Sequence, residues 1–524
     1  MVLRLRWSIL VLAAALAVPG CGGGGGDAGG PAPPPGAGVS GPAWWGFGRD
    51  AQHAATGAIA TQDLSRITWQ TPVDLAPQRQ PGGALLIHYG SPVVTTQNTV
   101  IVPVKTGATG GFRFEARSGA NGGLIWSGES DYVLPAHNWV PSYNLALNAT
   151  NRLYAPGAGG KLFVRDNADA AAGTLQTAVF FGASTYAAAQ ATYDATVFVN
   201  TPLTVDAAGN VFFGFIVTGA NPAGLASGVA RIGADGVGTW AAVSALTNDP
   251  AITKLATNSA PALSPDRGTL YVAVNTARVS GQVQGGYLVA LDAATLAVRA
   301  RALLLDPGSA GGAARARVSD DSTASATVGP DGKVYFGVLE SVFGSHNARG
   351  WLLQFNAQLA PIGAPGGFGW DNTASIVPAS MLASYNGPSS YLLMVKYNNY
   401  LGAGTGDGVN KIAVIDPGVS QTDAISGLPI MREVLSIAGP TLEDGSSVAV
   451  KEWCINTAAV DPATNSVLAN SEDGFLYRWH LPSNSFTQRI QLTSGIAESY
   501  TPTAIGADGK VYAVNNAVLF SIGR

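Results

Sequence analysis

Polar and aromatic side chains stand just ahead of a repeated strand-turn-strand unit, and they are the chain's best candidates for binding chemistry. Each precedes the innermost strand of its unit, and in a radial fold such positions converge on the central axis. Carboxylates, imidazoles, amides and indoles gathered there suit a small-molecule or metal pocket. The positions are His88, Tyr89, His137, Asn138, Trp139, Asn200, Asn258, Asp321, Asp371, Trp453, Glu498 and Tyr500.

The alternative is that these residues have a structural role, and the sequence favours this alternative. Polar residues at strand starts cap turns and fill hydrated channels. Asp321 and Glu498 are the candidate ligands if calcium binds, but no local spacing connects them, so we assign no metal ligand. Cys454 has no neighbouring histidine that would activate it. We assign no catalytic residue, and an enzyme is the less favoured class.

The repeated unit itself explains how these side chains are positioned. It joins a small or Pro residue and a short apolar run to a turn rich in Asp, Asn and Gly, followed by an aromatic or β-branched run. Such turns connect antiparallel strands, because Asp and Asn cap them and Gly accepts positive φ. Clear copies start at Thr201, Ala260, Ser325 and Thr501, and weaker copies start at Ser91, Val140, Val377 and Thr457.

Each unit is followed by a third strand and a shorter fourth stretch, and four antiparallel strands make a propeller blade. The last unit is too close to the C-terminus to complete its own blade. We expect residues 66–71 (RITWQT) to complete it, which closes the ring and removes free sheet edges. The predicted fold is all-β, a single propeller of four-stranded blades closed by N- and C-terminal strands. Eight blades are expected, and seven are the alternative.

The N-terminus predicts export and a lipid anchor. A basic start precedes an apolar run over residues 9–18, which has signal-peptide length and is too short to span a membrane. The sequence VPGC that ends at Cys21 resembles the lipobox of bacterial lipoproteins, which implies acylation of the Cys21 thiol. An ordinary cleavage site with a chance cysteine is the alternative.

The expected organisation is a signal peptide over residues 1–20, a flexible Gly/Pro tether over 21–40 and the propeller over 41–524. The residue after Cys21 is Gly22. By resemblance to known lipoprotein sorting, an Asp at this position would favour the inner membrane, so Gly22 implies the outer membrane. We therefore expect an exported, lipid-anchored monomer in the outer membrane, on the periplasmic face or at the cell surface.

Charge and cysteine content narrow the class further. Lys and Arg number 29 against 33 Asp and Glu, and 12% of the 524 residues are charged. This near-balance provides no long-range attraction for nucleic acid, so no nucleic-acid partner is expected. The chain has two cysteines. If Cys21 carries the lipid, Cys454 is left unpaired and the body depends on its core alone.

The repeats resemble those of the pyrroloquinoline-quinone (PQQ) type propeller superfamily. Residues 44–53 (WWGFGRDAQH), followed by Trp69, are similar to the opening segment of these proteins. Residues 290–295 are similar to the blade motif AxDxxTGxxxW, with Leu296 at the glycine position and no Trp. Residues 115–126 form a stretched copy. The resemblance covers residues 42–524 and implies the fold. The superfamily includes calcium-dependent quinoprotein dehydrogenases and cofactor-free scaffolds such as an outer-membrane-assembly lipoprotein.

The dehydrogenases of this superfamily use a Trp floor, a calcium ion held by Glu, Asn and Asp, a catalytic Asp and often a vicinal disulfide. Trp453 or Trp139 is the candidate floor, but the chain has no Cys-Cys pair. We therefore expect no cofactor. The favoured hypothesis is a non-catalytic scaffold that binds a protein or an envelope polysaccharide through loops on one axial face. A PQQ- and calcium-dependent dehydrogenase, or a calcium-dependent hydrolase, is the alternative.

Overall fold

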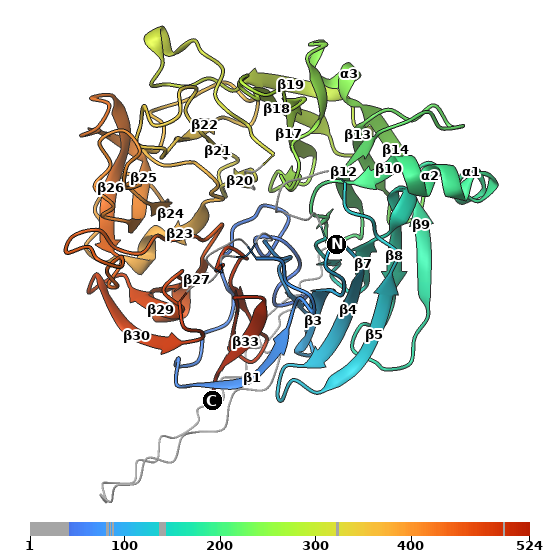
Figure 1. Ribbon diagram of the computed structural model, residues 1–524, viewed down its shortest axis with the longest axis horizontal. Coiled ribbons are helices and arrows are strands. Elements are labelled where there is room, and N and C mark those ends of the chain that lie inside the picture. Colours follow the sequence, from blue (N-terminus) through green and yellow to red (C-terminus); the bar gives the residue numbers. More distant parts are fainter. Residues whose placement is uncertain are drawn as a thin grey trace, which may run out of the picture. The chain divides into compact units, whose positions relative to one another are not determined.

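The computed structural model describes residues 41–79, 83, 85, 88–135, 143–320, 324–495 and 498–524. In this part of the chain eight antiparallel sheets are arranged as a ring around a central axis (Figure 1). Seven sheets contain four or five strands, and the fifth along the chain contains three. The predicted all-β propeller of eight blades is confirmed, and the seven-bladed alternative is wrong.

The first four blades follow one another along the chain. Blade 1 contains β2 (Val93–Val94), β3 (Thr99–Lys105), β4 (Phe112–Ser118) and β5 (Leu124–Ser130). Blade 2 contains β6 (Ala146–Leu147), β7 (Leu153–Pro156), β8 (Lys161–Arg165) and β9 (Leu175–Val179). Blade 3 contains β10 (Val197–Val199), β11 (Thr204–Val205), β12 (Val211–Val217), β13 (Gly228–Ile232) and β14 (Gly238–Ala242). Blade 4 contains β15 (Ile252–Leu255), β16 (Ala262–Leu263), β17 (Thr269–Thr276), β18 (Gly286–Asp292) and β19 (Val298–Leu303).

The second half of the ring repeats this plan. Blade 5 contains β20 (Thr327–Val328), β21 (Val334–Val338) and β22 (Trp351–Phe355). Blade 6 contains β23 (Ser375–Pro378), β24 (Tyr391–Tyr397), β25 (Lys411–Thr422) and β26 (Pro429–Ala438). Blade 7 contains β27 (Ala459–Asp461), β28 (Ser466–Asn470), β29 (Phe475–His480) and β30 (Ser485–Gln491). Blade 8 contains β31 (Ala504–Ile505), β32 (Val511–Asn515), β33 (Val518–Gly523) and β1 (Arg66–Pro72).

Short helices lie between some strands: α1 (Ala183–Ala188), α2 (Gln190–Thr196) and α3 (Val243–Thr247). In the part of the chain that the structure describes, no helix has the length and apolar character needed to cross a membrane. Strands β3 and β24 are buried along their whole lengths, because each blade packs between two neighbours. The hydrophobic core is therefore spread around the ring.

The ring closes as the sequence predicts. Strand β1 pairs antiparallel with β33, from Arg66 opposite Gly523 to Pro72 opposite Val518. Trp69 of β1 is 9% exposed, and its Nε1 donates a hydrogen bond of 3.1 Å to the Gly119 carbonyl of blade 1. The closing strand thus completes blade 8 and also ties it to blade 1.

The small hydroxyl residues of the repeat connect neighbouring blades. Each donates its side-chain hydroxyl to a backbone carbonyl at the corresponding position of the next blade. The bonds are Thr204 Oγ1 to Pro261 O at 2.5 Å, Thr327 Oγ1 to Ala374 O at 2.7 Å and Ser375 Oγ to Ala458 O at 2.6 Å. Such bonds satisfy buried backbone acceptors that a blade cannot satisfy by itself.

A segment that precedes β1 runs around the inside of the ring; we call residues 44–62 the belt, and it is the blue trace near the centre of Figure 1. Its backbone forms hydrogen bonds with seven of the eight blades, in or just after their inner strands. The bonds join Trp44 to Val94, Trp45 to Leu147, Ala51 to Leu263, Gln52 to Val328, Ala54 to Ile376, Ala55 to Val460 and Gln62 to Gly509, at 2.7 to 3.1 Å. The belt therefore occupies the axis where the inner strands end.

Strands alternate in direction through each blade, so every loop belongs to one of two faces. We call the face where the inner strands begin the upper face, and the opposite face, toward the belt, the lower face. The loops from the second to the third strand of each blade lie on the upper face. The turns from the third to the fourth strand, such as residues 233–237, lie on the lower face.

The blade motif keeps its backbone geometry without its glycine. Leu296 stands at the glycine position and has φ of 60°. This left-handed conformation is costly for a leucine but free for glycine. The Asp292 carboxylate holds the turn by accepting hydrogen bonds from the Ala294 and Thr295 backbone N–H groups, at 3.0 and 2.8 Å. The turn is thus kept by the aspartate.

Candidate functional site

Four predicted site residues, His137, Asn138, Trp139 and Asp321, lie outside the described residues. The same holds for the predicted lipidation site Cys21 and for the tether over residues 21–40. The remaining predicted positions form three groups: four residues that meet at the axis, two aromatic residues that pack within their blades, and two asparagines that connect blades.

The group at the axis comes from blades 1, 6 and 8; we call His88, Asp371, Lys396, Glu498 and Tyr500 the axial cluster. The Tyr500 hydroxyl donates a hydrogen bond of 2.5 Å to Asp371 Oδ1. The His88 ring lies 4.0 Å from the Tyr500 ring, centroid to centroid. Lys396 Nζ lies 3.8 Å from Asp371 Oδ2 and 5.5 Å from the centre of the Tyr500 ring. Four predicted residues are therefore neighbours, around a lysine that was not predicted.

Glu498 is the carboxyl of this cluster with the fewest polar partners. Its Oε1 accepts a hydrogen bond from the Tyr500 backbone N–H, while Oε2 has no partner among the described residues. The residue is 7% exposed. Burial raises the pKa of Glu498 to about 8, the charge of Asp371 adds to the rise, and the Tyr500 N–H opposes it. Glu498 therefore keeps its proton over much of the neutral range.

The basic members of the cluster respond to the same environment. Burial lowers the pKa of His88 to about 3, and the charge of Lys396 contributes, so the imidazole is neutral at neutral pH. Lys396 is 2% exposed within β24, whose other residues are also buried. A lysine in a wholly buried strand needs a charge partner, and that sequence signal could have identified Lys396.

Two further carboxyls from blade 7, Glu452 and Glu472, flank the cluster; we call them the outer carboxyls. Both are partly exposed. Burial raises the pKa of both, and the charge of Glu452 raises that of Glu472 further. Burial and these carboxylates also hold the pKa of the Cys454 thiol well above its usual value. Cys454 is thus an unreactive thiol rather than a nucleophile.

Two predicted aromatic residues belong to the packing of their blades. The Tyr89 hydroxyl donates a hydrogen bond of 2.9 Å to Asp74, which forms a buried ion pair with Lys105. Trp453 is fully buried, and its ring lies 5.6 Å from that of Tyr477 and 5.8 Å from that of Phe486. Trp453 therefore offers no stacking surface at the axis.

The two predicted asparagines connect blades 3 and 4. Asn200 Nδ2 donates a hydrogen bond of 2.9 Å to the Leu255 carbonyl, and the Asn258 backbone N–H donates one of 2.8 Å to the Asn200 carbonyl. Both side chains are buried. Both asparagines therefore have the structural role that we expect of polar residues at the start of a strand.

The described residues do not fit calcium and PQQ. No three of their His, Cys, Asp or Glu side chains are arranged to hold a metal ion. Trp453 lies in the core, and the body has a single cysteine and hence no vicinal disulfide. Of the two candidate calcium ligands, Asp321 lies outside the described residues, and the Glu498 carboxyl keeps its proton over much of the neutral range. Asp371 in the same cluster is paired with the Lys396 ammonium. We therefore derive no step through either group.

The upper face also carries exposed apolar side chains on loops of blades 5 and 6. We call this set the apolar rim; its members are between 49% and 67% exposed, and they are Val342, Phe343, Leu401, Leu442 and Val448. On the lower face Val237 is similarly exposed, in the turn from β13 to β14. Clustered exposed apolar residues mark interaction surfaces, whereas single ones are ordinary.

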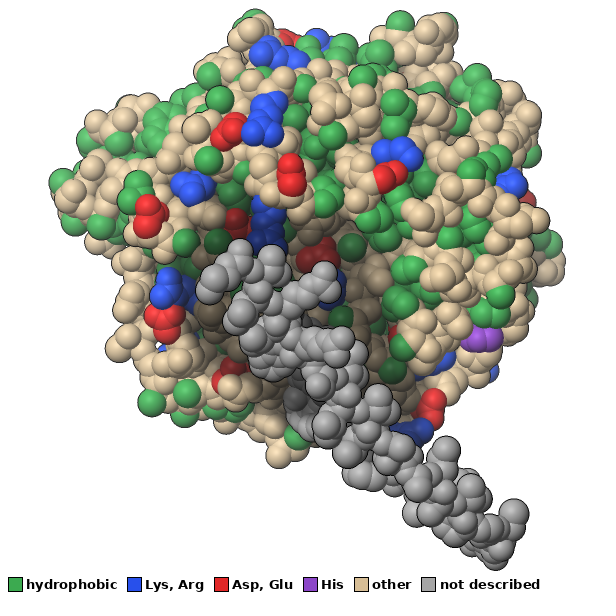
Figure 2. Space-filling model, turned by 180° about the vertical axis from the view of Figure 1, so that it is seen from behind, with side chains coloured by type: hydrophobic (Ala, Val, Ile, Leu, Met, Phe, Trp, Pro, Cys, Tyr) green, Lys and Arg blue, Asp and Glu red, His purple; other side chains and the backbone are tan. Residues whose placement is uncertain are grey.

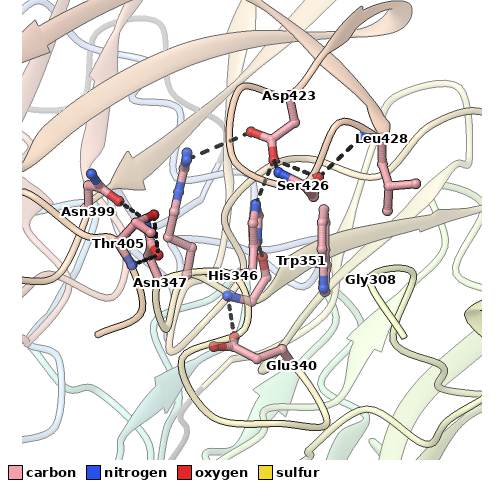
Figure 3. A network of polar contacts seen from close by, with 12 residues as sticks. Gly308, Glu340, His346, Asn347, Trp351, Asn399, Thr405, Asp423, Ser426 and Leu428 are labelled. Carbon is pink, nitrogen blue, oxygen red and sulfur yellow. Dashed lines mark hydrogen bonds and ion pairs between the residues drawn. The ribbon is translucent and has the colours of Figure 1, made fainter. Parts of the chain in front are cut away.

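Backbone and side-chain hydrogen bonds join the loops of the rim. Asn347 in the loop after β21 donates a hydrogen bond of 2.8 Å to Asn399 in the loop after β24 (Figure 3). Asn347 Oδ1 accepts one of 2.7 Å from the Thr405 N–H. The Val450 N–H donates one of 3.0 Å to the Gly408 carbonyl. The rim is therefore built on connected loops.

His346 anchors this loop system from below. Its Nε2 lies 3.0 Å from Asp423 Oδ2 and its Nδ1 lies 3.0 Å from the Gly350 carbonyl, while the ring stacks at 3.8 Å on Trp351 (Figure 3). Glu340 accepts hydrogen bonds of 2.9 Å from the Gly344 and Gly350 N–H groups. The loop after β21 is thus held from inside.

Asp423 connects this anchor to the β25–β26 hairpin. Burial raises the pKa of Asp423, but hydrogen bonds from His346 and Ser426 outweigh it and hold that pKa below its usual range. Beyond Asp423, Ile430 packs in the core of blade 5, and the Met431 N–H donates a hydrogen bond of 2.8 Å to the Pro365 carbonyl. The hairpin of blade 6 thus packs on three-stranded blade 5.

Replacing this anchor is expected to loosen the upper face. His346→Ala removes a buried, stacked and hydrogen-bonded side chain and leaves Asp423 without its His346 partner, so we expect a loss of about 2–4 kcal/mol in unfolding free energy. His480→Ala is the control, since His480 is partly exposed at the end of β29. Urea unfolding measures both. Equal losses in the two variants would contradict the anchoring role.

Glu498 makes stability depend on pH. Its carboxyl ionises near pH 4.5 in the unfolded chain but near pH 8 in the folded one. The folded state therefore binds the proton more tightly, and stability falls as the pH rises from 4.5 to 8, by at most about 5 kcal/mol. Glu498→Gln is expected to be more stable than the wild type at pH 8, by about 2–4 kcal/mol, and close to it at pH 5. Urea unfolding at both pH values tests this, and a variant less stable at pH 8 would contradict it.

Figure 2 shows the molecule from behind, with one face hollowed at its centre and charged side chains on the visible walls of the hollow.

No family model matches the chain, and no curated protein is similar to it in sequence. Solved structures do resemble it. A europium-containing methanol dehydrogenase superposes with a TM-score of 0.52 at 10% identity, over 91% of this chain and 89% of that one.

Two further solved structures are similar. A quinohemoprotein alcohol dehydrogenase from Comamonas testosteroni has a TM-score of 0.53 at 12% identity, over 92% of this chain and 81% of that one. BamB from Moraxella catarrhalis has a TM-score of 0.40 at 12% identity, over 87% of this chain and 100% of that one. The likeness to the two dehydrogenases shows the fold alone. It agrees with the propeller fold that the repeats predict.

Proposed function

We propose that the chain is a non-catalytic, membrane-tethered propeller that binds a protein partner on its upper face. One observation carries the proposal: the exposed apolar rim and the charged axial cluster occupy the same face. A transient protein interface combines apolar anchors with polar groups, and this face offers both. The hydrogen-bonded loops beneath the rim limit the ordering that binding requires.

A protein fits this surface better than an envelope polysaccharide. Polysaccharide sites present exposed aromatic rings on which sugar faces stack. The rim contains one aromatic residue, Phe343, among aliphatic ones, and Trp453 is buried. Aliphatic and aromatic anchors around charged groups suit a partner with an apolar patch and complementary charge.

The tether defines where this binding takes place. We propose that Cys21 is acylated and that residues 21–40 hold the propeller off the outer membrane, as a Gly/Pro-rich leash does without folding. The protein is then exported and anchored, on the periplasmic face or at the cell surface. Its partner is an envelope protein within reach of the leash.

Capture from detergent-solubilised envelopes with the immobilised mature protein tests the proposal. We expect one or a few proteins to be retained by the wild type. The double variant Phe343→Ser, Leu401→Ser should retain them at least tenfold less, because losing two interface anchors costs about 2 kcal/mol or more. Val237→Ser is the matched control, an exposed apolar residue on the lower face, and it should capture as the wild type does.

Other outcomes separate the alternatives. Equal capture by the rim variant would place the interface elsewhere and contradict the proposal. Retention on a polysaccharide column that the rim variant abolishes would identify a polymer as the ligand instead. Stoichiometric calcium in the purified protein, together with PQQ-dependent dye reduction, would identify the dehydrogenase alternative, and we expect neither.

A further inference from the structure

A groove lies on the outer flank of the ring between blades 2 and 3; we call it the flank groove. Strands β9 and β14, the outermost strands of these two blades, lie side by side there (Figure 1). Residues 176–183 of blade 2 and residues between 232 and 240 of blade 3 line it. Its volume is about 850 Å³, within the range of about 300–1,000 Å³ in which proteins bind small molecules. The groove is therefore large enough for a ligand.

The walls of the groove are held in place by the protein itself. A Cβ on Gly238 would overlap the Phe180 carbonyl oxygen, so glycine lets the start of β14 lie against the turn after β9. The Phe180 ring packs on the Phe215 ring, with 4.5 Å between centroids. The Gly233 N–H donates a hydrogen bond of 2.8 Å to the Val237 carbonyl across the turn that leads into β14. A preformed groove lowers the ordering cost of binding.

Trp240 of β14 forms part of one wall and is partly exposed, as is Phe181 nearby in the same lining. Trp126 offers a comparison, because both tryptophans lie in the outermost strand of their blade, opposite an alanine of the strand before it. Trp126 is 7% exposed, Arg165 covers its ring at 4.0 Å, and its Nε1 donates a hydrogen bond of 2.8 Å to the Ala168 carbonyl. Trp126 is thus used up in packing between blades, whereas Trp240 borders open space.

Polar groups border this aromatic surface. Gln176 is exposed and lies opposite Val164 in the β8–β9 pair, and both residues line the groove, so the Gln176 amide lies on the groove side of the sheet. Arg152 also lines the groove, and its guanidinium donates two hydrogen bonds to Asp166, at 2.6 and 3.2 Å. Arg152 is the one charged side chain among the described lining residues, and Asp166 balances it. The groove therefore has hydrogen-bonding groups but no net charge.

This combination favours one class of ligand. The apolar face of a sugar ring stacks on an aromatic ring, and its hydroxyl groups exchange hydrogen bonds with amide and guanidinium groups. An ion would find no unbalanced charge, and a wholly apolar ligand would cover polar groups without bonding to them. We propose that the flank groove binds a neutral saccharide, a unit of an envelope polysaccharide, with Trp240 as the stacking surface and Gln176 and Arg152 as hydrogen-bonding groups. This second binding function does not depend on the protein interface proposed for the upper face.

Isothermal titration of the mature protein with neutral hexasaccharides of glucose, of mannose and of N-acetylglucosamine tests the proposal. We expect at least one to bind with a Kd of about 1 mM or below. Trp240→Ala should weaken that binding about tenfold or more, whereas Trp240→Phe keeps an aromatic ring and should retain most of it. Gln176→Ala should weaken it about threefold or more through the lost hydrogen bond. Because Gln176 is exposed, its replacement leaves the fold intact even if Trp240→Ala is unstable.

Two control variants should bind the saccharide as the wild type does. Trp370→Ala removes a partly exposed tryptophan that does not line the groove. The double variant Phe343→Ser, Leu401→Ser changes the apolar rim on the upper face. Thermal melting followed by circular dichroism shows that each variant is folded before its binding is compared.

Binding of none of the three hexasaccharides, or binding unchanged in both Trp240→Ala and Gln176→Ala, would overturn the saccharide site. Loss of binding in the rim variant alone would place the sugar on the upper face and overturn it as well. A sulfated hexasaccharide should bind no more tightly than the neutral ones, because Asp166 balances Arg152. Tighter binding of the sulfated sugar, lost in Arg152→Gln, would identify an anion site instead and overturn the proposal.

Discussion

A chain shortened to begin at residue 73 is expected to lose cooperative folding. The truncation removes strand β1, which completes blade 8, and the belt, which contacts seven blades through its backbone. It also removes the buried Trp44 and Trp69. Loss of one buried Trp side chain costs about 3–5 kcal/mol, against a total stability of about 5–15 kcal/mol for a typical domain. The remaining sheets would keep an open edge at β33.

The matched control begins at residue 41 and lacks only the segment before the belt. We expect it to melt at the temperature of the mature protein, in a single transition by circular dichroism. Trp44→Ala in that shortened chain should fold but lose about 3–5 kcal/mol. A chain from residue 73 that melts as the control does would show that neither the belt nor β1 holds the ring together.

The second large effect is expected at Lys396. Lys396→Met keeps the length of the side chain but leaves Asp371 without its ion partner in a buried site. Breaking a buried ion pair by removing one partner costs about 3–5 kcal/mol, because the remaining charge stays desolvated. The double variant Lys396→Met, Asp371→Asn removes both charges, so we expect it to recover more than half of the loss.

Unfolding in urea of the wild type, both single variants and the double variant forms a complete double-mutant cycle. Arg299→Met is the control, since Arg299 pairs with Asp292 on the exposed lower surface, where ion pairs contribute little. A Lys396→Met variant no less stable than Arg299→Met, or additive losses in the double variant, would contradict the pairing of Lys396 with Asp371.

The fold was predictable from sequence because its signals are local and repeated. An Asp-containing turn follows the inner strand in every clear copy, and a threonine opens that strand in two of them; both features have a structural cause. Thr204 and Thr327 bond to the next blade, and Asp206 accepts the Asn210 N–H at 2.9 Å in its turn. The closing strand was predictable because the last unit lacks a fourth strand.

The site was predictable only in part. His88, Asp371, Glu498 and Tyr500 precede inner strands, so their convergence follows from the repeat. Lys396 does not, because it lies within a second strand, and its role depends on which carboxyl faces it. Trp453 precedes an inner strand as well, yet it turns into the core of blade 7. Position along the repeat predicts the neighbourhood of a side chain, but not its direction.

The apolar rim could not be predicted, for a different reason. Val342, Phe343 and Leu401 lie in loops without a periodic pattern, so no periodicity indicates whether their side chains are exposed. Their exposure follows from contacts between loops of different blades, through Asn347, and from the buried His346 beneath. These contacts join residues about 50 to 80 positions apart in sequence.

Site-specific photo-crosslinking in intact envelopes tests the central claim, binding on the upper face, most directly. A photoreactive residue replaces Leu401 on the upper face in one protein and Asp235 on the lower face in another. We expect a discrete crosslinked protein from position 401 and none from position 235. A partner crosslinked from position 235 and absent from position 401 would contradict binding on the upper face.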